Sequence, residues 1–123
     1  MQRSVLIVDD ERNLLVLLDS VLSKEGFQVR TANNALDALE FFDHGDERFN
    51  IAILDIKMFP VGGVALLAEI KRRSPSTQVV MITAYPTADT RNECLRIGAA
   101  DYLTKPLDIQ EELTTVVRKL AAV

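Results

Sequence analysis

The sequence predicts an α/β fold, in which a single doubly wound parallel sheet of five strands is covered by five helices. Three observations predict it. Short β-branched runs alternate with longer segments of helical period, and the first, third and fourth runs are apolar throughout, as in strands covered on both faces. Gly26 and Gly98 stand where helices should end, because glycine adopts the left-handed C-cap conformation without a Cβ clash. Strands joined by helical crossovers form a parallel sheet with helices on both faces.

The elements follow one another as strand and helix five times. The strands are predicted at residues 5–8, 28–31, 51–54, 79–82 and 101–103, and the helices by apolar residues three or four apart. The apolar residues that define the five helices are Leu14, Leu17, Leu18, Val21 and Leu22; Leu36, Leu39 and Phe42; Leu66, Leu67 and Ile70; Cys94, Leu95 and Ile97; and Leu113, Val116, Val117 and Leu120.

Composition narrows the class of protein. The chain has 123 residues, of which 48% are hydrophobic, so we expect one domain over residues 1–123. The formal charge of −4 argues against a nucleic-acid-binding surface. One cysteine, Cys94, and one histidine, His44, exclude an internal disulfide and a Cys/His metal site. No aliphatic run approaches membrane-spanning length and no signal peptide opens the chain, so we expect a cytoplasmic protein that does not bind membranes.

Polar side chains follow four of the five predicted strands. Asp9 and Asp10 follow the first, Asp55 the third, Thr83 the fourth and Lys105 the fifth. Ligands of parallel sheets bind outside the carboxyl ends of the strands, where the winding direction reverses. Helix capping explains any one of these residues but not all four together. The sequence therefore predicts a functional site at this edge of the sheet.

The chemistry expected there is phosphoryl transfer with magnesium. Three carboxylates and one lysine leave a charge that suits one divalent cation, and Mg²⁺ prefers hard oxygen ligands such as carboxylates and phosphates. Asp55, alone at the end of a central strand, is the predicted nucleophile, and Asp9 and Asp10 form the predicted metal-binding pair. Lys105 and Thr83 would bind phosphoryl oxygens.

At this point the sequence resembles the receiver domain of two-component response regulators over residues 3–121. The resemblance rests on four motifs in a fixed order: VDDE from Val8, LDIKM from Leu54, MITA from Met81 and GAADYLTKP from Gly98. It implies a flavodoxin-like fold with the strand order 2-1-3-4-5. It also implies that a histidine kinase or phosphotransfer protein phosphorylates Asp55.

The resemblance adds further site residues. The backbone carbonyl of Lys57 would be a metal ligand beside Asp9, Asp10 and Asp55, and the backbone amide of Ala84 would contact the phosphoryl group together with Lys105. The Lys105-Pro106 bond would be cis.

The resemblance also implies a switch made of Thr83 and Tyr102. On phosphorylation Thr83 would turn toward the new anion, and Tyr102 would move into the space that it leaves. This movement would repack the face made by the fourth helix, the fifth strand and the fifth helix. That face would control an output domain or effector, and phosphorylation could produce a homodimer. The domain would catalyse only its own phosphorylation and dephosphorylation, so it is not expected to be an enzyme.

Two positions depart from the family pattern. Phe59 and Gly62 stand where receivers commonly have proline and often aspartate, with proline displaced to Pro60, so the loop after the third strand is expected to take an unusual path. Lys57 and Tyr85 occupy variable positions that, in the family, tune the lifetime of the acyl phosphate. A bulky Tyr85 would hinder the attacking water, which predicts slow dephosphorylation.

Three other classes of protein have motifs or contacts that can be compared with this sequence. A phosphatase of the haloacid-dehalogenase type requires Asp-x-Asp after its first strand, whereas this chain has Asp-Asp-Glu. A dinucleotide-binding module requires a Gly-x-Gly-x-x-Gly motif, which does not occur after any predicted strand. The remaining competitor is a degenerate receiver that binds a partner without phosphorylation, for which Phe59, Val61 and the Tyr85-Pro86 pair are the candidate contacts.

Overall fold

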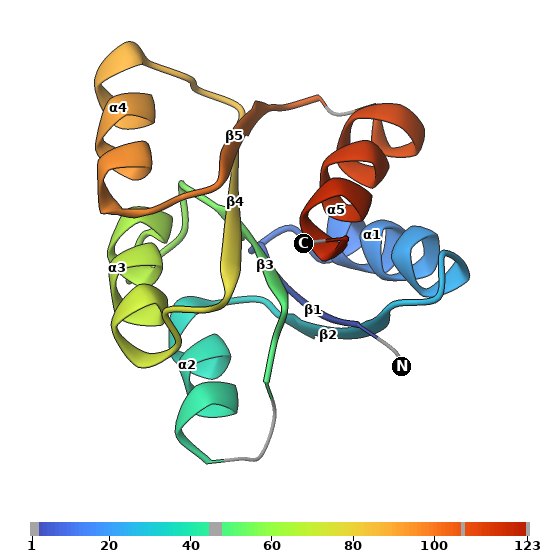
Figure 1. The fold of residues 1–123 in the computed structure, drawn as a ribbon. Helices are drawn as coiled ribbons and strands as arrows, with labels where there is room; N and C mark the ends of the chain where they lie inside the picture. The colour runs from blue at the N-terminus through green and yellow to red at the C-terminus, as the bar shows by residue number, and fades with distance from the viewer. Residues whose placement is uncertain (1–2, 45–47, 107, 123) are drawn as a thin grey trace.

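A computed structural model describes residues 3–44, 48–106 and 108–122 of the chain. Five parallel strands form one sheet in the order β2-β1-β3-β4-β5, with helices on both faces (Figure 1). This confirms the predicted fold class and strand order. The strands are β1 Ser4–Val8, β2 Gln28–Ala32, β3 Ile51–Asp55, β4 Gln78–Thr83 and β5 Asp101–Thr104.

Each strand extends one or two residues beyond the range expected from its apolar run. Pairing explains the difference, because the register continues to residues that carry no β signal of their own: Ser4 pairs with Gln28, and Asp55 with Ile82. Consequently Asp55 and Thr83 are the last residues of β3 and β4 and share the rigid geometry of the sheet.

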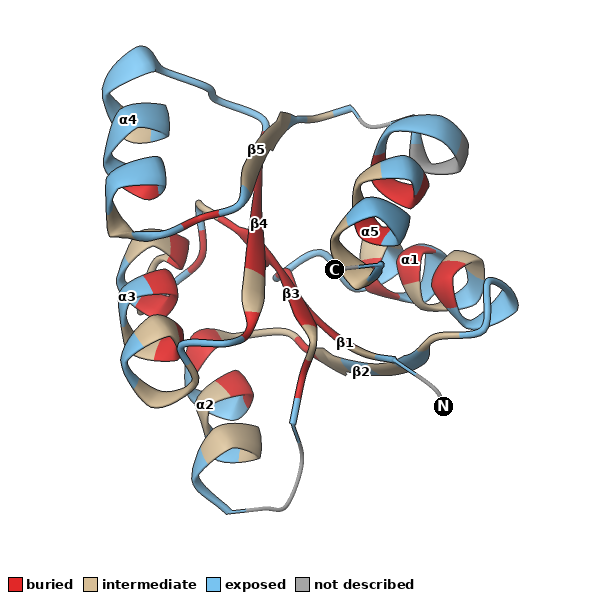
Figure 2. Cartoon of the chain, in the orientation of Figure 1, coloured by how far each residue is buried: buried red, intermediate tan, exposed pale blue. Residues whose placement is uncertain are grey.

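The helices pack in two layers. Helices α1 (Arg12–Lys24) and α5 (Thr114–Ala121) pack against one face of the sheet, and α2 (Ala35–Asp43), α3 (Gly63–Arg73) and α4 (Ala88–Ile97) against the other (Figure 1). Every residue of β3 is buried, and the buried sides of the helices face the sheet (Figure 2). Successive side chains of β1 and β3 point to opposite faces, so these uniformly apolar strands serve both cores.

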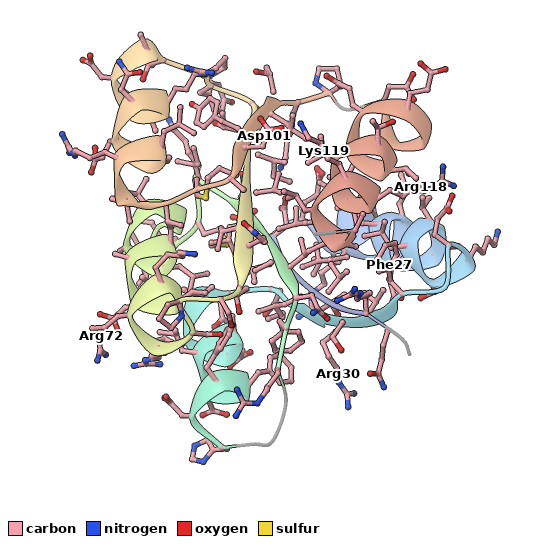
Figure 3. All side chains as sticks on the ribbon, in the orientation of Figure 1. Phe27, Arg30, Arg72, Asp101, Arg118 and Lys119 are labelled. Carbon is pink, nitrogen blue, oxygen red and sulfur yellow. The ribbon has the colours of Figure 1, made fainter. Side chains whose placement is uncertain are left out.

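Helix ends follow local capping rules. Asn34 and Thr87 cap α2 and α4, their side chains accepting hydrogen bonds from the amides of Asp37 and Thr90. Gly98, which ends α4, has a φ of 130°, and Gly26, after α1, has a φ of 97°. Both glycines therefore occupy the conformation expected from the sequence. Arg118 of α5 donates a hydrogen bond to Glu25, the residue that follows α1, and so links the last helix to the first. Figure 3 labels Arg118 near the end of α1.

The helical periods predicted the helices but not every buried position. Leu17, Leu36 and Leu95 lie on helices, as expected, yet they are 48%, 56% and 37% exposed. On α1 the buried residues are Leu15, Leu18 and Leu22, because the face that meets the sheet is rotated from the one the sequence indicated. The last helix also differs: a π-helical turn, Ile109–Leu113, precedes α5 and contains the buried Leu113.

Within the part of the chain that the structure describes, no helix is both long and apolar enough to cross a membrane.

Candidate functional site

Three carboxylates meet at the carboxyl ends of β1 and β3. Asp9 and Asp10 follow β1 directly, and Asp55 ends the neighbouring β3. One oxygen from each lies within 4.8 Å of one oxygen from each of the others. Asp9 is fully buried and Asp55 is 5% exposed, whereas Asp10 is exposed. The sheet closes this cluster on one side, and the cluster is open to solvent at Asp10. We call Asp9, Asp10 and Asp55 together the acidic rim.

Lys105 brings the only ammonium group to this cluster among the described residues. Its Nζ lies 2.8 Å from Asp9 Oδ2 and 3.5 Å from Asp55 Oδ1. The peptide after β5 places it there: the Lys105 amide donates to the Thr83 carbonyl, and the following Lys105–Pro106 bond is cis, as expected. Although burial alone would lower the pKa of Lys105, its hydrogen bond to Asp9 and the charges of Asp9 and Asp55 raise it.

The two oxygens of Asp9 are both engaged. Oδ1 accepts from the amide of Glu11 at 2.9 Å, and Oδ2 accepts from Lys105. Because a buried carboxylate is costly without partners, these two bonds explain how Asp9 is tolerated at 0% exposure. Asp10 and Asp55 keep more of their acceptor capacity.

Asp55 is electrostatically strained. Burial, followed by the nearby negative charge of Asp9, raises its pKa from 3.8 to about 6, and Lys105 offsets only part of this effect. Asp10 adds to the rise. A buried carboxylate close to other negative charges is stabilised when a cation binds next to it.

The loop after β3 wraps tightly under Asp55. Gly63, the first residue of α3, donates its amide to the Ile56 carbonyl at 2.8 Å. A Cβ atom at this position would lie 2.1 Å from the Asp55 carbonyl oxygen, so only glycine fits. The unusual path expected from Phe59 and Gly62 takes the form of a second cis bond, Phe59–Pro60, and Phe59 itself is 87% exposed.

Thr83 and Tyr102 lie on adjacent strands. Thr83, at the end of β4, is 1% exposed, and its hydroxyl oxygen accepts from the Tyr85 amide at 3.0 Å. Tyr102 of β5 packs against the core on the α2, α3 and α4 side. Its hydroxyl is buried and has no hydrogen-bond partner among the described residues. The ring is thus turned inward while its polar end is left unsatisfied.

The Lys57 and Tyr85 side chains are in contact across the rim. The Lys57 Nζ lies 4.5 Å from the centroid of the Tyr85 ring, a cation–π arrangement. The sequence identified both positions separately but not this contact, since they lie on different loops. It also missed Gly63 and the Glu11 amide as supports of the site. The signal for Gly63 was a glycine eight residues after Asp55. The Glu11 amide left no signal in the sequence, because every residue except proline has a backbone N–H group.

Comparison with known proteins agrees with this geometry. The response regulator receiver domain family matches residues 5–118. Over 120 residues the chain is 39% identical to the transcriptional regulatory protein ZraR of Klebsiella oxytoca, covering 98% of this chain and 27% of ZraR. The chain thus spans about a quarter of the length of ZraR.

Two solved structures extend the likeness to three dimensions. The CheY-like receiver domain protein from Methanospirillum hungatei JF-1 has a TM-score of 0.91 and 30% identity, covering 99% of this chain and 96% of that one. Response regulator TrrA from Thermotoga maritima, solved in complex with Mg²⁺-BeF, has a TM-score of 0.83 and 32% identity, covering 97% and 99%. The fold of the chain and the acidic rim at its strand ends agree with these likenesses. The chain belongs to the response regulator receiver domain family, because the family model matches it over residues 5–118.

Proposed function

We propose that this receiver domain accepts a phosphoryl group on Asp55 from a histidine kinase or phosphotransfer protein, with Mg²⁺ as cofactor. The observation that carries the proposal is the meeting of Asp9, Asp10, Asp55 and Lys105 at one rim. Asp55 ends the middle strand of the sheet, is 5% exposed and lies beside the Lys105 ammonium group. Unlike Asp9, whose two oxygens already accept hydrogen bonds, it keeps acceptor capacity.

The donor set fits magnesium. Mg²⁺ prefers hard oxygen ligands, and carboxylates are commonly among them. One oxygen from each of the three carboxylates lies within 4.8 Å of the others, so one small divalent ion could be held beside them. Because both oxygens of Asp9 already accept hydrogen bonds, Asp10 and Asp55 are the stronger candidates for direct ligands, with Asp9 contributing charge. The Lys57 carbonyl is proposed as a further ligand by family resemblance.

Each residue then has a defined part in the transfer. An Asp55 oxygen forms the new bond to phosphorus while the bond between phosphorus and the donor nitrogen breaks, and the donor imidazole leaves with that electron pair. Lys105, already 3.5 Å from Asp55, pairs with one phosphoryl oxygen, and the Ala84 amide and Thr83 hydroxyl donate to the others. Bound Mg²⁺ would neutralise charge on the phosphoryl oxygens.

The output is conformational. The Thr83 oxygen accepts from the Tyr85 amide, so its hydroxyl hydrogen is available to a phosphoryl oxygen, and a movement of Thr83 toward that oxygen would be passed to the loop before α4. Helix α4 has only one buried residue, Cys94, and is therefore suited to move. We assign the changed face to α4, β5 and α5, which would contact an output domain, an effector or a second copy.

The Tyr85 ring, which lies in contact with Lys57, is expected to hinder the water that attacks the acyl phosphate and so to slow dephosphorylation.

Intact-mass measurement with a small acyl-phosphate donor tests the assignment. The wild-type chain should gain one phosphoryl group in the presence of Mg²⁺ and none after chelation, and Asp55→Asn should gain none. Asp89→Asn, which removes an exposed carboxylate on α4, is the matched control and should behave like the wild type. A phosphoryl group on Asp55→Asn would place the acceptor elsewhere, and none on the wild type would favour the degenerate, phosphorylation-independent receiver.

A further inference from the structure

A groove of about 820 Å³ runs along the free edge of the sheet, between α1 and α2. Strand β2 is the end strand, with α1 over one face of the sheet and α2 over the other (Figure 1). The floor of the groove is formed by the end of this strand, Thr31 and Ala32, and by Asn33. Among the described residues that line it, none belongs to the acidic rim, so the groove is a separate feature.

The backbone at the floor has unused hydrogen-bonding capacity. Gln28 donates to the Arg3 carbonyl, and the Ala32 carbonyl accepts from Asp9, so these even-numbered residues direct their backbone groups toward β1. Backbone groups of successive residues in a strand point to opposite sides, which turns those of Thr31 toward the groove. No strand lies beyond β2 in the described part of the chain. The edge can therefore pair with an added strand.

The walls have the length and polarity to receive such a strand. Each wall presents positions i, i+3, i+4 and i+7, from Arg12 to Asp19 on α1 and from Asp37 on α2 to its C-cap residue, His44. Seven helical steps span about 10 Å, the length of about three extended residues. The centre is apolar, being formed by Leu15, Val16 and Phe41, and Val16 is 70% exposed. Alternate side chains of an added strand would face α1 and α2 in turn.

The net charge of the groove walls favours a partner segment of positive net charge. Asp19, Asp37 and Glu40 oppose one cation, Arg12, a surplus of two negative charges with His44 neutral. Asp19 and Asp37 accept side-chain hydrogen bonds from neutral groups only, Ser23 Oγ and Asn34 Nδ2, and none of the three acids has an ion pair with another described residue. A second copy would bring the same negative surplus, which disfavours pairing of two β2 edges.

We propose that the groove binds an extended, net-positive segment of a partner protein by adding a strand to β2. Apolar side chains of the segment would contact Leu15, Val16 and Phe41, and its cations would lie near Asp19, Asp37 and Glu40. The Thr31 amide and carbonyl would supply the backbone hydrogen bonds. Because the groove lies apart from Asp55, this binding does not depend on the phosphoacceptor role.

Amide NMR titration with the peptide acetyl-Lys-Lys-Val-Val-Lys-Lys-amide tests the proposal. We expect saturable shifts confined to residues 29–33, at the end of β2, and to the facing sides of α1 and α2, with slowed hydrogen exchange at the Thr31 amide. The same peptide N-methylated at both valines keeps its charge but loses backbone donors, and it should not bind saturably. Glu40→Lys should weaken binding about fivefold or more by reversing a wall charge, whereas Glu93→Lys on α4 should not.

Three outcomes would overturn it. Equal binding of the N-methylated peptide would show that charge alone is responsible, and an absence of saturable shifts at millimolar peptide would remove the site. Shifts that depend on protein concentration without peptide would make the edge a contact between copies. Phosphorylation of the wild-type chain is measured separately, so failure here and failure of the Asp55 assignment are distinguishable.

Discussion

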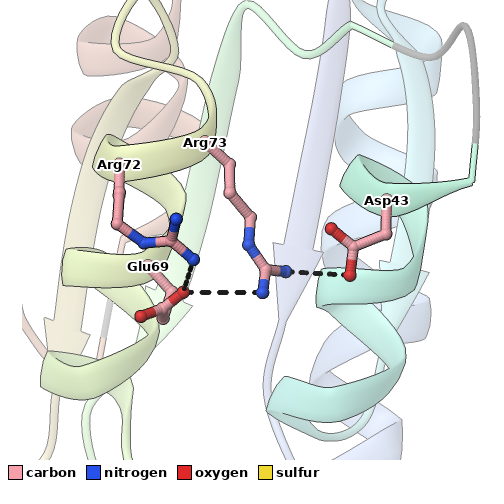
Figure 4. Close-up of polar contacts among 4 residues, drawn as sticks. All are labelled: Asp43, Glu69, Arg72 and Arg73. Carbon is pink, nitrogen blue, oxygen red and sulfur yellow. Dashed lines mark hydrogen bonds and ion pairs between the residues drawn. The ribbon is translucent and has the colours of Figure 1, made fainter.

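Two clusters of charged side chains in this domain are built in opposite ways. At the strand ends, Asp9, Asp10 and Asp55 share a single ammonium group, and two of the three carboxylates are buried. Between α2 and α3, two carboxylates meet two guanidinium groups near the helix ends (Figure 4). In that second cluster Arg73 reaches both Asp43 at 3.1 Å and Glu69 at 3.5 Å, and all four side chains are at least 25% exposed.

The two clusters differ in charge balance and burial, and this difference shows which of them is suited to bind a ligand. The helix cluster is balanced and solvated, so each pair contributes little and nothing remains to attract a ligand. In the strand-end cluster the negative excess is held in place by the sheet, and it costs free energy until a cation or a proton neutralises it. The rim is thus destabilised in the free domain in the way that a cation-dependent site requires.

Replacing Lys105 with methionine should have the largest effect on the free domain. Among the described residues, Lys105 is the one charged partner of fully buried Asp9, and its loss should lower the free energy of unfolding by about 3 kcal/mol. Urea unfolding with chelator measures it. Added Mg²⁺ should recover part of the loss; if the variant is as stable as the wild type, Lys105 is not the compensating charge.

Asp55→Asn should act in the opposite direction. Removing one carboxylate from the negative excess should raise the free energy of unfolding on the order of 2 kcal/mol without metal, in line with the raised pKa of Asp55. Urea unfolding in chelator should show the gain, and Mg²⁺ should stabilise the wild type more than the variant. Asp89→Asn serves as control and should lower the unfolding midpoint slightly rather than raise it, because Asp89 is an exposed carboxylate in the first turn of α4.

The advantage of Asp55→Asn should depend on pH. Because the pKa of Asp55 is raised from 3.8 to about 6 in the folded chain, its stabilising contribution is present at low pH and is lost as the pH rises through 6. Without metal, the difference between variant and wild type should be full at pH 8, roughly half as large at pH 5 and small near pH 4. A difference that is constant over this range would show that Asp55 titrates normally.

The smallest effect is expected in the balanced cluster. Arg73→Gln removes the contacts with both Asp43 and Glu69, yet the melting temperature should fall by no more than about 3 °C. The deficit should shrink in 0.5 M salt, because exposed pairs are screened. A loss as large as that of Lys105→Met would erase the contrast between the two clusters.

The fold and the acidic rim were predictable because their signals are local. An apolar run followed by Asp9-Asp10 or by Asp55 marks a buried strand and its carboxyl end, and parallel strands bring such ends to one edge. Burial on the helices was less predictable. Leu17 and Leu36 have helical spacing, but which side of a helix faces the sheet depends on packing with distant elements.

The sequence by itself determined five strands, five helices, the chemical groups at the strand ends and hence the family, since periodicity and residue type are properties of neighbouring residues. Only the tertiary structure decided that Lys105 pairs most closely with Asp9, that Gly63 must lack a side chain, that Lys57 meets Tyr85, and that the β2 edge lies open between two helices. These depend on distances between residues remote in the chain, which are set when the sheet and helices pack together.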